Sequence, residues 1–448
     1  MEENLLNFES IKKVHIQTFG CQMNEYDTRK ILEVLRRENY LQTDCQNEAD
    51  LIILNTCSIR EKAENKVFSE LGRLKKLKLL NPDLKIGVGG CLAQQEGENI
   101  LKRSNNVDFV FGTDNLFELP KMLNKVESGI KISFTERQKR QKVRNFIPNY
   151  TFKQSKNFGI KAQIAITKGC NNHCSFCVVP LTRGSEVSRE PANILSEARR
   201  LVFGGVREIC LLGQNVNSYK ANGIDFVELL KSLDEIENLK RIRFISPHPK
   251  DFKIDLANAF VNLPSLCEHM HLPLQSGSDR ILRKMRRWYT IEKFHEKVSM
   301  LRDRIPKATI STDLIVGFPG ETEKEFEMTM DAVRKIRFDL IYAFKYSPRP
   351  GTKAAEYNGH ISEKVKSERL NILLKTQEKI TKEKNESLKG SIQEVLIEGK
   401  HYRRENILTG RSRGYHSLLV KDCGIEIGEI LPVRIKGANK NSLIAEPL

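Results

Sequence analysis

Short apolar runs alternate with longer amphipathic segments through the first 120 or so residues. The runs cover residues 14–18, 51–54 and 85–88, and each precedes a helical stretch. The second of these stretches carries apolar residues at helical spacing, namely Val67, Leu71, Leu74 and Leu77. Runs that alternate with helices predict an α/β fold with a doubly wound parallel sheet, in which ligands gather beyond the carboxyl ends of the strands.

A second series of apolar runs begins after residue 160. Its members cover residues 164–166, 209–212, 242–245, 270–274, 310–316 and 341–344, and helical segments separate them. Six βα units are too few to close an eight-stranded barrel, so the pattern predicts an open, partial TIM barrel whose functional groups lie on the loops after the strands. Residues in those positions are Gln214, Asn215, Ser246, Pro247, His248, Gln275, Ser276, Gly317 and Arg349.

The pattern changes again in the last quarter of the chain. Residues 362–388 form a charged segment with Val365, Leu373 and Ile380 at helical spacing. From about residue 390, short apolar runs alternate with glycines at 399, 410, 414, 424, 428 and 437. Short strands with glycines at the turns predict a small β-barrel.

The net charge points to an acidic partner. The chain of 448 residues has room for two to four domains, and its formal charge is +17 with a pI near 9.3. Residues 121–156 hold ten Lys or Arg against two Glu, so +8 of the +17 falls in this stretch. A generally solvated basic surface is the alternative, but a concentrated stripe favours a nucleic acid.

The ten cysteines do not indicate a secreted disulfide scaffold. The chain starts Met1-Glu2-Glu3-Asn4 without the basic and apolar regions of a signal peptide, and no apolar run approaches the ~18 residues of a membrane span. We therefore expect a soluble protein of the cytoplasm, where reduced thiols serve as metal ligands.

Three of these cysteines lie in one loop. Cys170, Cys174 and Cys177 form a C-x3-C-x2-C run directly after the apolar run 164–166. Three thiolates can hold three irons of a 4Fe-4S cluster and leave the fourth iron without a protein ligand. A structural zinc site would need a fourth ligand, and Cys210 lies inside an apolar run instead. Zinc and unliganded thiols remain the alternatives.

Three further cysteines share a position relative to the first series of strands. Cys21, Cys57 and Cys91 each follow a predicted strand by one to three residues, so they should converge at one edge of the sheet. We interpret them as a second cluster site. Packing as small hydrophobic residues is the alternative, and it suits the other cysteines better, namely Cys45, Cys210, Cys267 and Cys423.

Motifs around these cysteines and along nearly the whole chain resemble the radical S-adenosylmethionine methylthiotransferases. They include Phe19-Gly20-Cys21-Gln22-Met23-Asn24, Asn55-Thr56-Cys57-Ser58-Ile59-Arg60, Gly89-Gly90-Cys91-Leu92, Val178-Val179-Pro180, Leu272-Pro273-Leu274-Gln275-Ser276-Gly277-Ser278, Asp313-Leu314-Ile315-Val316-Gly317-Phe318-Pro319-Gly320-Glu321-Thr322 and Tyr346-Ser347-Pro348-Arg349-Pro350-Gly351-Thr352. The resemblance implies two 4Fe-4S clusters, one on each cysteine triad, and S-adenosylmethionine bound at the free iron of the first. It also implies a 5′-deoxyadenosyl radical that activates C2 of an adenosine in tRNA, with sulfur delivered through the second cluster.

The resemblance also suggests residues that contact S-adenosylmethionine. Those after strands are Gln214, Ser246, Gln275 and Gly317. Gly204 and Gly205 precede the second barrel strand and resemble the motif that contacts the methionine amino group, although a tight helix-to-strand turn explains a glycine pair equally well. For His269 and His271 we expect packing or hydrogen bonding rather than metal ligation.

The carboxyl-terminal segment resembles the TRAM domain, an RNA-binding module. Arg403, Arg404, Arg411 and Arg413 lie near Tyr402 and Tyr415, a mixture suited to phosphate contact and base stacking, with a solvated charged hairpin as the alternative. We therefore expect four parts: a methylthiotransferase domain (1–125), a basic linker (126–155), a radical core (156–388) and a TRAM domain (389–448). The implied partners are tRNA, a flavodoxin or ferredoxin as electron donor, and a sulfur source.

Local sequence favours isopentenyladenosine as the substrate. The segment 58–66 after Cys57 and the run Leu274-Gln275-Ser276 match that type of enzyme. Related enzymes act on threonylcarbamoyl-adenosine in tRNA or on an aspartate of a ribosomal protein. The run Ser246-Pro247-His248-Pro249 departs from the usual Ser-His-Pro and leaves the role of His248 open. From another class, a non-catalytic RNA-binding electron carrier is disfavoured because such carriers close each cluster with four thiolates.

Overall fold

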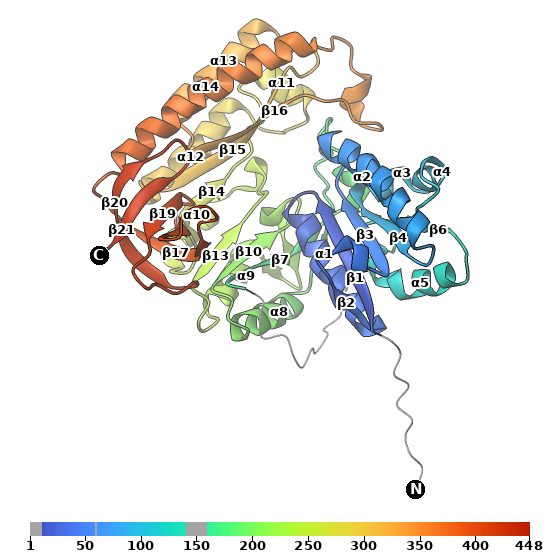
Figure 1. The fold of residues 1–448 in the computed structure, drawn as a ribbon. Coiled ribbons are helices and arrows are strands. Elements are labelled where there is room, and N and C mark those ends of the chain that lie inside the picture. Colours follow the sequence, from blue (N-terminus) through green and yellow to red (C-terminus); the bar gives the residue numbers. More distant parts are fainter. Residues whose placement is uncertain (1–10, 59–60, 140–158) are drawn as a thin grey trace. The chain divides into compact units, whose positions relative to one another are not determined.

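The computed structural model describes residues 11–58, 61–139 and 159–448, and the chain divides into two compact units (Figure 1). The first unit holds residues 1–148, 168–171 and 178–189, and the second holds 149–167, 172–177 and 190–448. Most of the basic stretch predicted as a linker, and residues 59 and 60 of the substrate-type segment, lie outside the described residues. In the described ranges no helix is both long and apolar enough to cross a lipid bilayer.

The first unit is a doubly wound parallel sheet, as predicted. Its six strands run in the order β2-β1-β3-β4-β5-β6, and all five pairings are parallel. The strands are β1 (Lys12–Phe19), β2 (Tyr40–Gln42), β3 (Leu51–Thr56), β4 (Lys85–Gly90), β5 (Phe109–Phe111) and β6 (Ile132–Phe134). The helices are α1 (Gln22–Leu35), α2 (Glu61–Leu80), α3 (Cys91–Glu96), α4 (Glu98–Arg103) and α5 (Leu119–Glu127).

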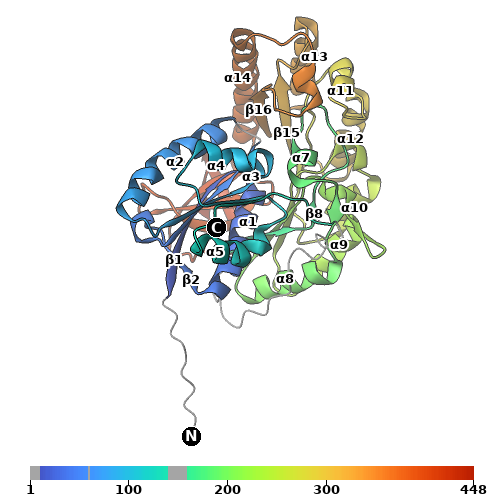
Figure 2. The ribbon, with the colours of Figure 1, turned by 90° about the vertical axis from the view of Figure 1, so that its right-hand side faces the viewer.

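Helices cover both faces of this sheet (Figure 2). One apolar cluster joins the sheet to α1 and α5, and a second joins the opposite face to α2, α3 and α4. The predicted helical stripe lies on α2, where Val67, Leu71 and Leu74 are buried against the sheet. The sequence pattern missed β2, β5 and β6, which have three residues each. Strand β6 lies in the stretch predicted as a linker and forms the edge of the sheet.

The second unit contains all six strands predicted for the open barrel. They are β7 (Lys161–Ala165), β10 (Glu208–Leu212), β13 (Arg241–Phe244), β14 (His269–His271), β15 (Thr309–Val316) and β16 (Leu340–Lys345). Two parallel sheets of three strands, β13-β10-β7 and β14-β15-β16, are joined by a parallel bridge between Ile242 and Leu266. The six strands therefore follow one another in chain order and leave the barrel open.

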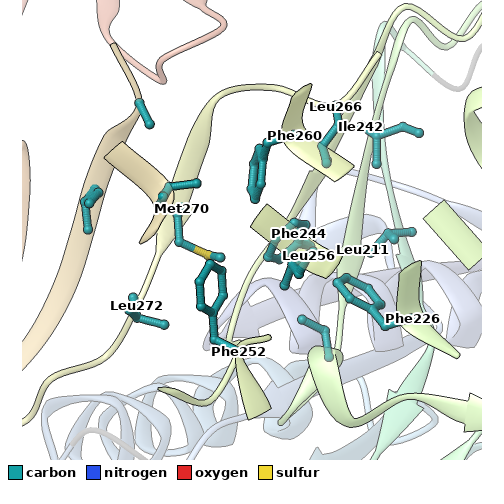
Figure 3. Packing of buried hydrophobic residues seen from close by; sticks show 14 of the residues in the cluster. Leu211, Phe226, Ile242, Phe244, Phe252, Leu256, Phe260, Leu266, Met270 and Leu272 are labelled. Carbon is teal, nitrogen blue, oxygen red and sulfur yellow. The ribbon is translucent and has the colours of Figure 1, made fainter. Parts of the chain in front are cut away.

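Helices pack around the barrel strands and enclose an apolar core. They are α8 (Pro191–Phe203), α9 (Phe226–Asp234), α10 (Ile254–Asn262), α11 (Asp279–Lys284), α12 (Ile291–Arg304) and α13 (Glu323–Ile336). Figure 3 shows the packing around Phe244, whose ring meets Phe226 edge-on at 5.1 Å between centroids. Shorter elements complete the region: β8 (Thr167–Lys168), α7 (Val179–Arg183), β9 (Val187–Ser188) and the hairpin β11 (Lys220–Ala221) with β12 (Ile224–Asp225).

A long helix leads into the small β-barrel that was predicted. Ser362 caps α14 (Glu363–Ser387). The closed barrel has the order β17-β18-β19-β21-β20, with β17 (Ile392–Lys400), β18 (Ile407–Ser412), β19 (Ser417–Lys421), β20 (Ile430–Ala438) and β21 (Leu443–Pro447). The expectation that every glycine marks a turn was wrong, since three of them lie inside strands, two at register shifts: Gly399, Gly410 and Gly437.

Buried arginines connect the small barrel to the starts of the large barrel's strands. Arg243 on β13 is 5% exposed and donates to Glu208 at 3.0 Å. It also donates to the carbonyl oxygens of Ser412 and Arg413, at 2.7 and 2.8 Å. All three nitrogens of this buried guanidinium donate a hydrogen bond, which makes the interface specific, because each bond lost would leave a desolvated group.

We expect Arg243→Met to lower the free energy of unfolding by about 3–5 kcal/mol, since it leaves the buried Glu208 with only the more distant Arg241, at 3.9 Å. Urea denaturation followed by circular dichroism measures the effect. The matched control is Arg334→Met, which removes an arginine whose side chain is half exposed and should change stability by less than about 1 kcal/mol. Equal free energies of unfolding for the two variants would contradict the conclusion that Arg243 stabilises the interface between the small barrel and the large one.

Candidate metal centres

The amino-terminal cysteines follow three neighbouring strands. Cys21 lies two residues after β1, Cys57 one residue after β3 and Cys91 one residue after β4. Since β1, β3 and β4 are adjacent and parallel, the three thiols lie at one edge of the sheet, as predicted. Cys21 is the residue that caps α1, and Cys91 is the first residue of α3. Helix amino termini favour the thiolate form of cysteine.

A pair of buried asparagines ties these loops together. Asn24 donates to the side chain of Asn55 at 3.2 Å and to the Thr56 carbonyl at 3.0 Å. Asn55 donates in return to the Asn24 carbonyl at 2.8 Å. The loops after β1 and β3 are therefore held in one arrangement. Sequence reasoning assigned these asparagines no role, although both lie in the quoted motifs.

Arg183 supplies positive charge to the same edge. It belongs to α7 of the first unit, is 3% exposed and donates to Asp27 at 2.8 Å. Burial opposes its charge, but Asp27, Cys91 and Cys21 together raise the pKa of Arg183. A hydrogen bond with Cys57, helped by Arg183 and opposed by burial, lowers the pKa of Cys21 to about 6. For Cys91 burial prevails over Arg183 and raises the pKa.

Sequence reasoning missed Arg183. The one available signal was its position, six residues beyond Cys177 and just after the quoted run Val178-Val179-Pro180. Nothing in that spacing indicates that the Arg183 side chain lies beside the amino-terminal cysteines rather than beside the three-cysteine loop.

A second buried cation holds the start of the three-cysteine loop. Lys168 donates to Asp114 at 2.7 Å and to the Thr113 carbonyl at 2.6 Å. Burial lowers the pKa of Lys168 despite the attraction of Asp114. Next comes Gly169, whose φ is +80°, and a Cβ there would lie 2.2 Å from the Ser185 carbonyl oxygen. Only glycine allows the main chain to pass this close to Ser185 just before it reaches Cys170.

The other two cysteines of the loop belong to the second unit. The Cys177 amide donates to the Cys174 carbonyl at 3.0 Å, so the pair lies on one tight turn. Between them, Ser175 donates from its amide to Met285 at 3.1 Å and from its hydroxyl to Lys284 at 2.8 Å. Its carbonyl accepts from Ala354 at 2.8 Å. The turn is thus anchored to the end of α11 and to the segment after β16.

A buried arginine also contacts this turn. Arg287 donates to the sulfur of Cys174 at 3.4 Å, to the Tyr289 hydroxyl oxygen at 3.0 Å and to the Pro273 carbonyl at 3.1 Å. Tyr289 is fixed in turn through bonds of its hydroxyl to Pro273 and Leu274, and burial raises its pKa to about 12. Sequence reasoning did not select Arg287 or Tyr289.

Four residues predicted to bind S-adenosylmethionine follow strands of the barrel on the same edge as the cysteine turn. They are Gln214 after β10, Ser246 after β13, Gln275 after β14 and Gly317 after β15. Three of them have left-handed backbones, with φ of +61° at Ser246, +70° at Gln275 and +71° at Gly317. For the non-glycine residues Ser246 and Gln275, such a conformation persists only where the surroundings enforce it, and strained backbones of this kind concentrate at functional sites. The role of the four residues stays a prediction.

The structure places Gly204 and Gly205 elsewhere. They end α8 and precede β10, at the opposite edge of the barrel strands. A five-residue strand at ~3.3 Å per residue separates them from the carboxyl edge by about 16 Å. Gly205 has a φ of +100°, as a tight helix-to-strand turn requires. This position fits the alternative, a tight helix-to-strand turn, better than contact with S-adenosylmethionine, and the assignment to the cofactor stays a prediction.

His248 occupies a defined position on the loop after β13. Its amide donates to the side chains of Asn215 and Asn217 at 3.2 and 2.8 Å, and its Nδ1 accepts from the Lys250 amide at 3.2 Å. Burial, with the charges of Arg287 and Lys250, lowers its pKa to about 2. The imidazole is therefore neutral, with its proton on Nε2. His269 and His271 both bond the Ser311 hydroxyl, at 2.9 and 3.0 Å, in keeping with a hydrogen-bonded role.

The four arginines proposed for RNA differ in their surroundings. Arg403 and Arg404 are exposed on the β17–β18 loop, beside Tyr402, which is 82% exposed. Arg413 instead donates hydrogen bonds to the Glu268 carboxylate at 2.8–3.0 Å, and Arg411 forms an ion pair with Glu398 at 3.4 Å. The charges of the latter two are largely compensated within the protein. RNA contact stays a prediction for all four, and the exposed pair fits it better.

The chemistry of the donor side chains at both sites fits iron–sulfur clusters. Across the described ranges, no group of three or more His, Cys, Asp or Glu side chains is placed to hold a metal ion. The residues converging at each site are nevertheless thiols beside a buried arginine, which suits an anionic thiolate cluster. Of the remaining cysteines, Cys267 is buried as expected, whereas Cys45 and Cys423 are exposed, so the packing role was wrong for those two.

Comparisons with known families and structures define the class of protein. Residues 164–333 match the Radical SAM superfamily, residues 13–112 match Uncharacterized protein family UPF0004, and residues 386–448 match the TRAM domain. A solved radical S-adenosylmethionine methyltransferase, TsrM from Kitasatospora setae, aligns with 77% of this chain at 14% identity and a TM-score of 0.57. That likeness shows the fold.

Full-length relatives define the family. The tRNA-2-methylthio-N(6)-dimethylallyladenosine synthase of Thermodesulfovibrio yellowstonii is 45% identical over 96% of this chain and 98% of its own length. The proteins of that name from Pelotomaculum thermopropionicum and Geobacter metallireducens are 43% and 45% identical over 96% and 97% of this chain, and over 96% and 98% of their own lengths. The chain belongs to this family of radical S-adenosylmethionine tRNA methylthiotransferases.

We expect Gly169→Ala to prevent cluster assembly on the three-cysteine loop. The added Cβ would collide with the main chain at Ser185 and displace Cys170. Iron and sulfide analysis after anaerobic reconstitution should give about four irons per chain instead of the ~8 of two cubane sites. Gly72→Ala is the matched control, because its Cβ would meet nothing within 4 Å and α2 favours alanine. Full iron content in the Gly169 variant would contradict the geometric argument.

Proposed function

We propose that the protein adds a methylthio group to C2 of N6-isopentenyladenosine, also called N6-dimethylallyladenosine, next to the anticodon of tRNA. The observation that carries this proposal is the identity of 43–45% with synthases of that product over almost the whole chain. The two cysteine triads support it, because sulfur insertion at an unactivated aromatic carbon needs one site for radical chemistry and one for sulfur.

Each triad has its own role in this proposal. Cys170, Cys174 and Cys177 hold one 4Fe-4S cluster, and Cys21, Cys57 and Cys91 hold the other. When bound there, the first cluster would supply the single electron that reductive cleavage of a C–S bond of S-adenosylmethionine requires. The protein's own residues fix the cofactor and exclude water, through the loops that carry Gln214, Ser246, Gln275 and Gly317, with strained backbones at Ser246 and Gln275.

The surroundings of the two triads suit these roles. Arg183 lies beside Cys91 and Cys21 in the first unit, and Arg287 lies beside Cys174 in the second. Each guanidinium stabilises thiolate ligands and an anionic cluster without occupying a coordination position. The neutral His248, held at the carboxyl edge, is a hydrogen-bond donor through Nε2.

The remaining assignments complete the proposal. The segment 1–125 carries the second cluster, 126–155 is a basic connection, 156–388 binds S-adenosylmethionine and 389–448 binds RNA. Arg403 and Arg404 contact phosphates, with Arg411 and Arg413 in a supporting position. A flavodoxin or ferredoxin supplies electrons, a separate source supplies sulfur, and the protein works in the cytoplasm with its tRNA.

The test is mass spectrometry of tRNA nucleosides from a bacterial strain without its own methylthiotransferases, with and without this protein. Expression should convert N6-isopentenyladenosine into its 2-methylthio derivative. A 2-methylthio derivative of threonylcarbamoyl-adenosine, or a methylthio mass increase on a ribosomal-protein aspartate, would support one of the alternative substrates instead. Unchanged nucleosides and ribosomal proteins would refute methylthiolation.

The exposed arginines predict a measurable electrostatic effect. Replacing both Arg403 and Arg404 by Ala should weaken tRNA binding and reduce the slope of log affinity against log salt by roughly 1.4–1.8, since each phosphate contact contributes ~0.7–0.9. Fluorescence anisotropy with labelled tRNA measures both quantities. The control is Arg334→Ala on α13, whose charge is already paired with Glu327 and Asp331. An unchanged salt slope in the double variant would remove these residues from the interface.

A further inference from the structure

The contact between Arg287 and Cys174 is specific in its geometry. The guanidinium is 5% exposed, and one of its nitrogens donates to the sulfur at 3.4 Å. Its other two nitrogens donate to the Tyr289 hydroxyl and the Pro273 carbonyl, so hydrogen bonds from all three nitrogens fix the plane of the guanidinium. An arginine side chain restrained in this way keeps its orientation when the Cys174 sulfur binds iron.

The backbone around Arg287 is strained in a way that directs this side chain inward. Arg286 and Trp288 have φ of +57° and +58°, a region that bulky L-residues rarely adopt. Trp288 is 68% exposed, whereas its two neighbours in the chain, Arg287 and Tyr289, are buried. Apolar burial does not explain why Arg286 and Trp288 both adopt left-handed backbones, since the side chain of Trp288, the only tryptophan of the sequence, is exposed. The strain instead maintains the arginine at the cysteine turn.

The charge of Arg287 is not neutralised by a neighbouring acid. Its partners, Tyr289 and Pro273, are neutral, and among the described residues no carboxylate forms an ion pair with it. Arg280, on the adjacent helix, shows the contrast, because Glu325 binds it through two oxygens at 2.6 Å. A desolvated, uncompensated cation interacts strongly with any negative charge nearby.

We propose that Arg287 is a positioning residue that raises the reduction potential of the cluster on Cys170, Cys174 and Cys177, by a hydrogen bond and a fixed positive charge at the Cys174 sulfur. The proposal rests on the cluster assignment above. Reduction adds one electron from the external donor and one unit of negative charge, with no bond broken. Hydrogen bonds to ligand sulfur and local charge are two of the factors that set such potentials. Arg287 therefore makes the reduced state accessible to a weaker donor.

Redox titration of a single-cluster protein, followed by electron paramagnetic resonance, tests this proposal. The reference is the full chain with Cys21, Cys57 and Cys91 replaced by Ala, so that only the three-cysteine loop loads iron. At the reference midpoint, Arg287→Met should lower the ratio of reduced to oxidised cluster about tenfold, a shift of about 59 mV to more negative potential. Arg287→Lys keeps the charge but not the fork of donors, and should shift the midpoint in the same direction by less.

Arg280→Met is the matched control, because it removes an arginine of the same segment that is paired with Glu325 and does not touch a cysteine. Its midpoint should equal that of the reference. Equal midpoints for the reference and Arg287→Met would overturn the proposal. If Arg287→Met fails to load iron, the Lys variant decides, and a reference midpoint there overturns it. Failure of the reference itself to load a cluster would instead refute the cluster assignment, and the tuning role with it.

Discussion

The parallel direction of the strands is the constraint on which both candidate sites depend. In the first unit, β1, β3 and β4 are neighbours with a common direction, so the loops that carry Cys21, Cys57 and Cys91 must end at one edge. In the second unit, six strands in chain order bring the loops after β10, β13, β14 and β15 to the edge where the cysteine turn lies. Only the cysteines of the three-cysteine loop are close in sequence, whereas the amino-terminal cysteines and the residues on the loops after the barrel strands are far apart along the chain.

Buried cations give these edges their chemical character. Arg183 and Lys168 are paired with Asp27 and Asp114, which offsets the desolvation of the four charges. Arg287 has only neutral partners besides the sulfur. A site lined by thiols and cations stabilises thiolate ligands and an anionic cluster. The arginines therefore connect the fold to the proposed chemistry, since both cysteine triads are served by residues from outside their own loops.

Much of this arrangement could be predicted from the sequence. The spacing of apolar residues along the chain predicted all six barrel strands, the three strands before the amino-terminal cysteines, and helix α14. Three short strands of the first sheet, β2, β5 and β6, were missed because three residues are too few for a periodic signal, whereas the equally short β14 was found within the longer apolar run 270–274. Contacts between distant parts of the chain could not be predicted either. Nothing in the local sequence distinguishes Arg287, which donates a hydrogen bond to Cys174, from Arg280. In the same way, nothing local distinguishes Arg413, which pairs with Glu268, from the exposed Arg403. The position of Gly204 and Gly205 could not be predicted either, because a glycine pair marks a turn without showing at which edge of the sheet that turn lies.

The central claim is that two cluster sites in one chain do different work, cofactor cleavage at one and sulfur insertion at the other. Quantifying 5′-deoxyadenosine and methylthiolated nucleoside in the same anaerobic reaction, with Cys177→Ala and Cys91→Ala variants, tests it most directly. The account predicts that the Cys177 variant forms neither product, while the Cys91 variant forms 5′-deoxyadenosine but no methylthiolated nucleoside. Loss of cofactor cleavage in a well-folded Cys91 variant, or methylthiolation by the Cys177 variant, would contradict it.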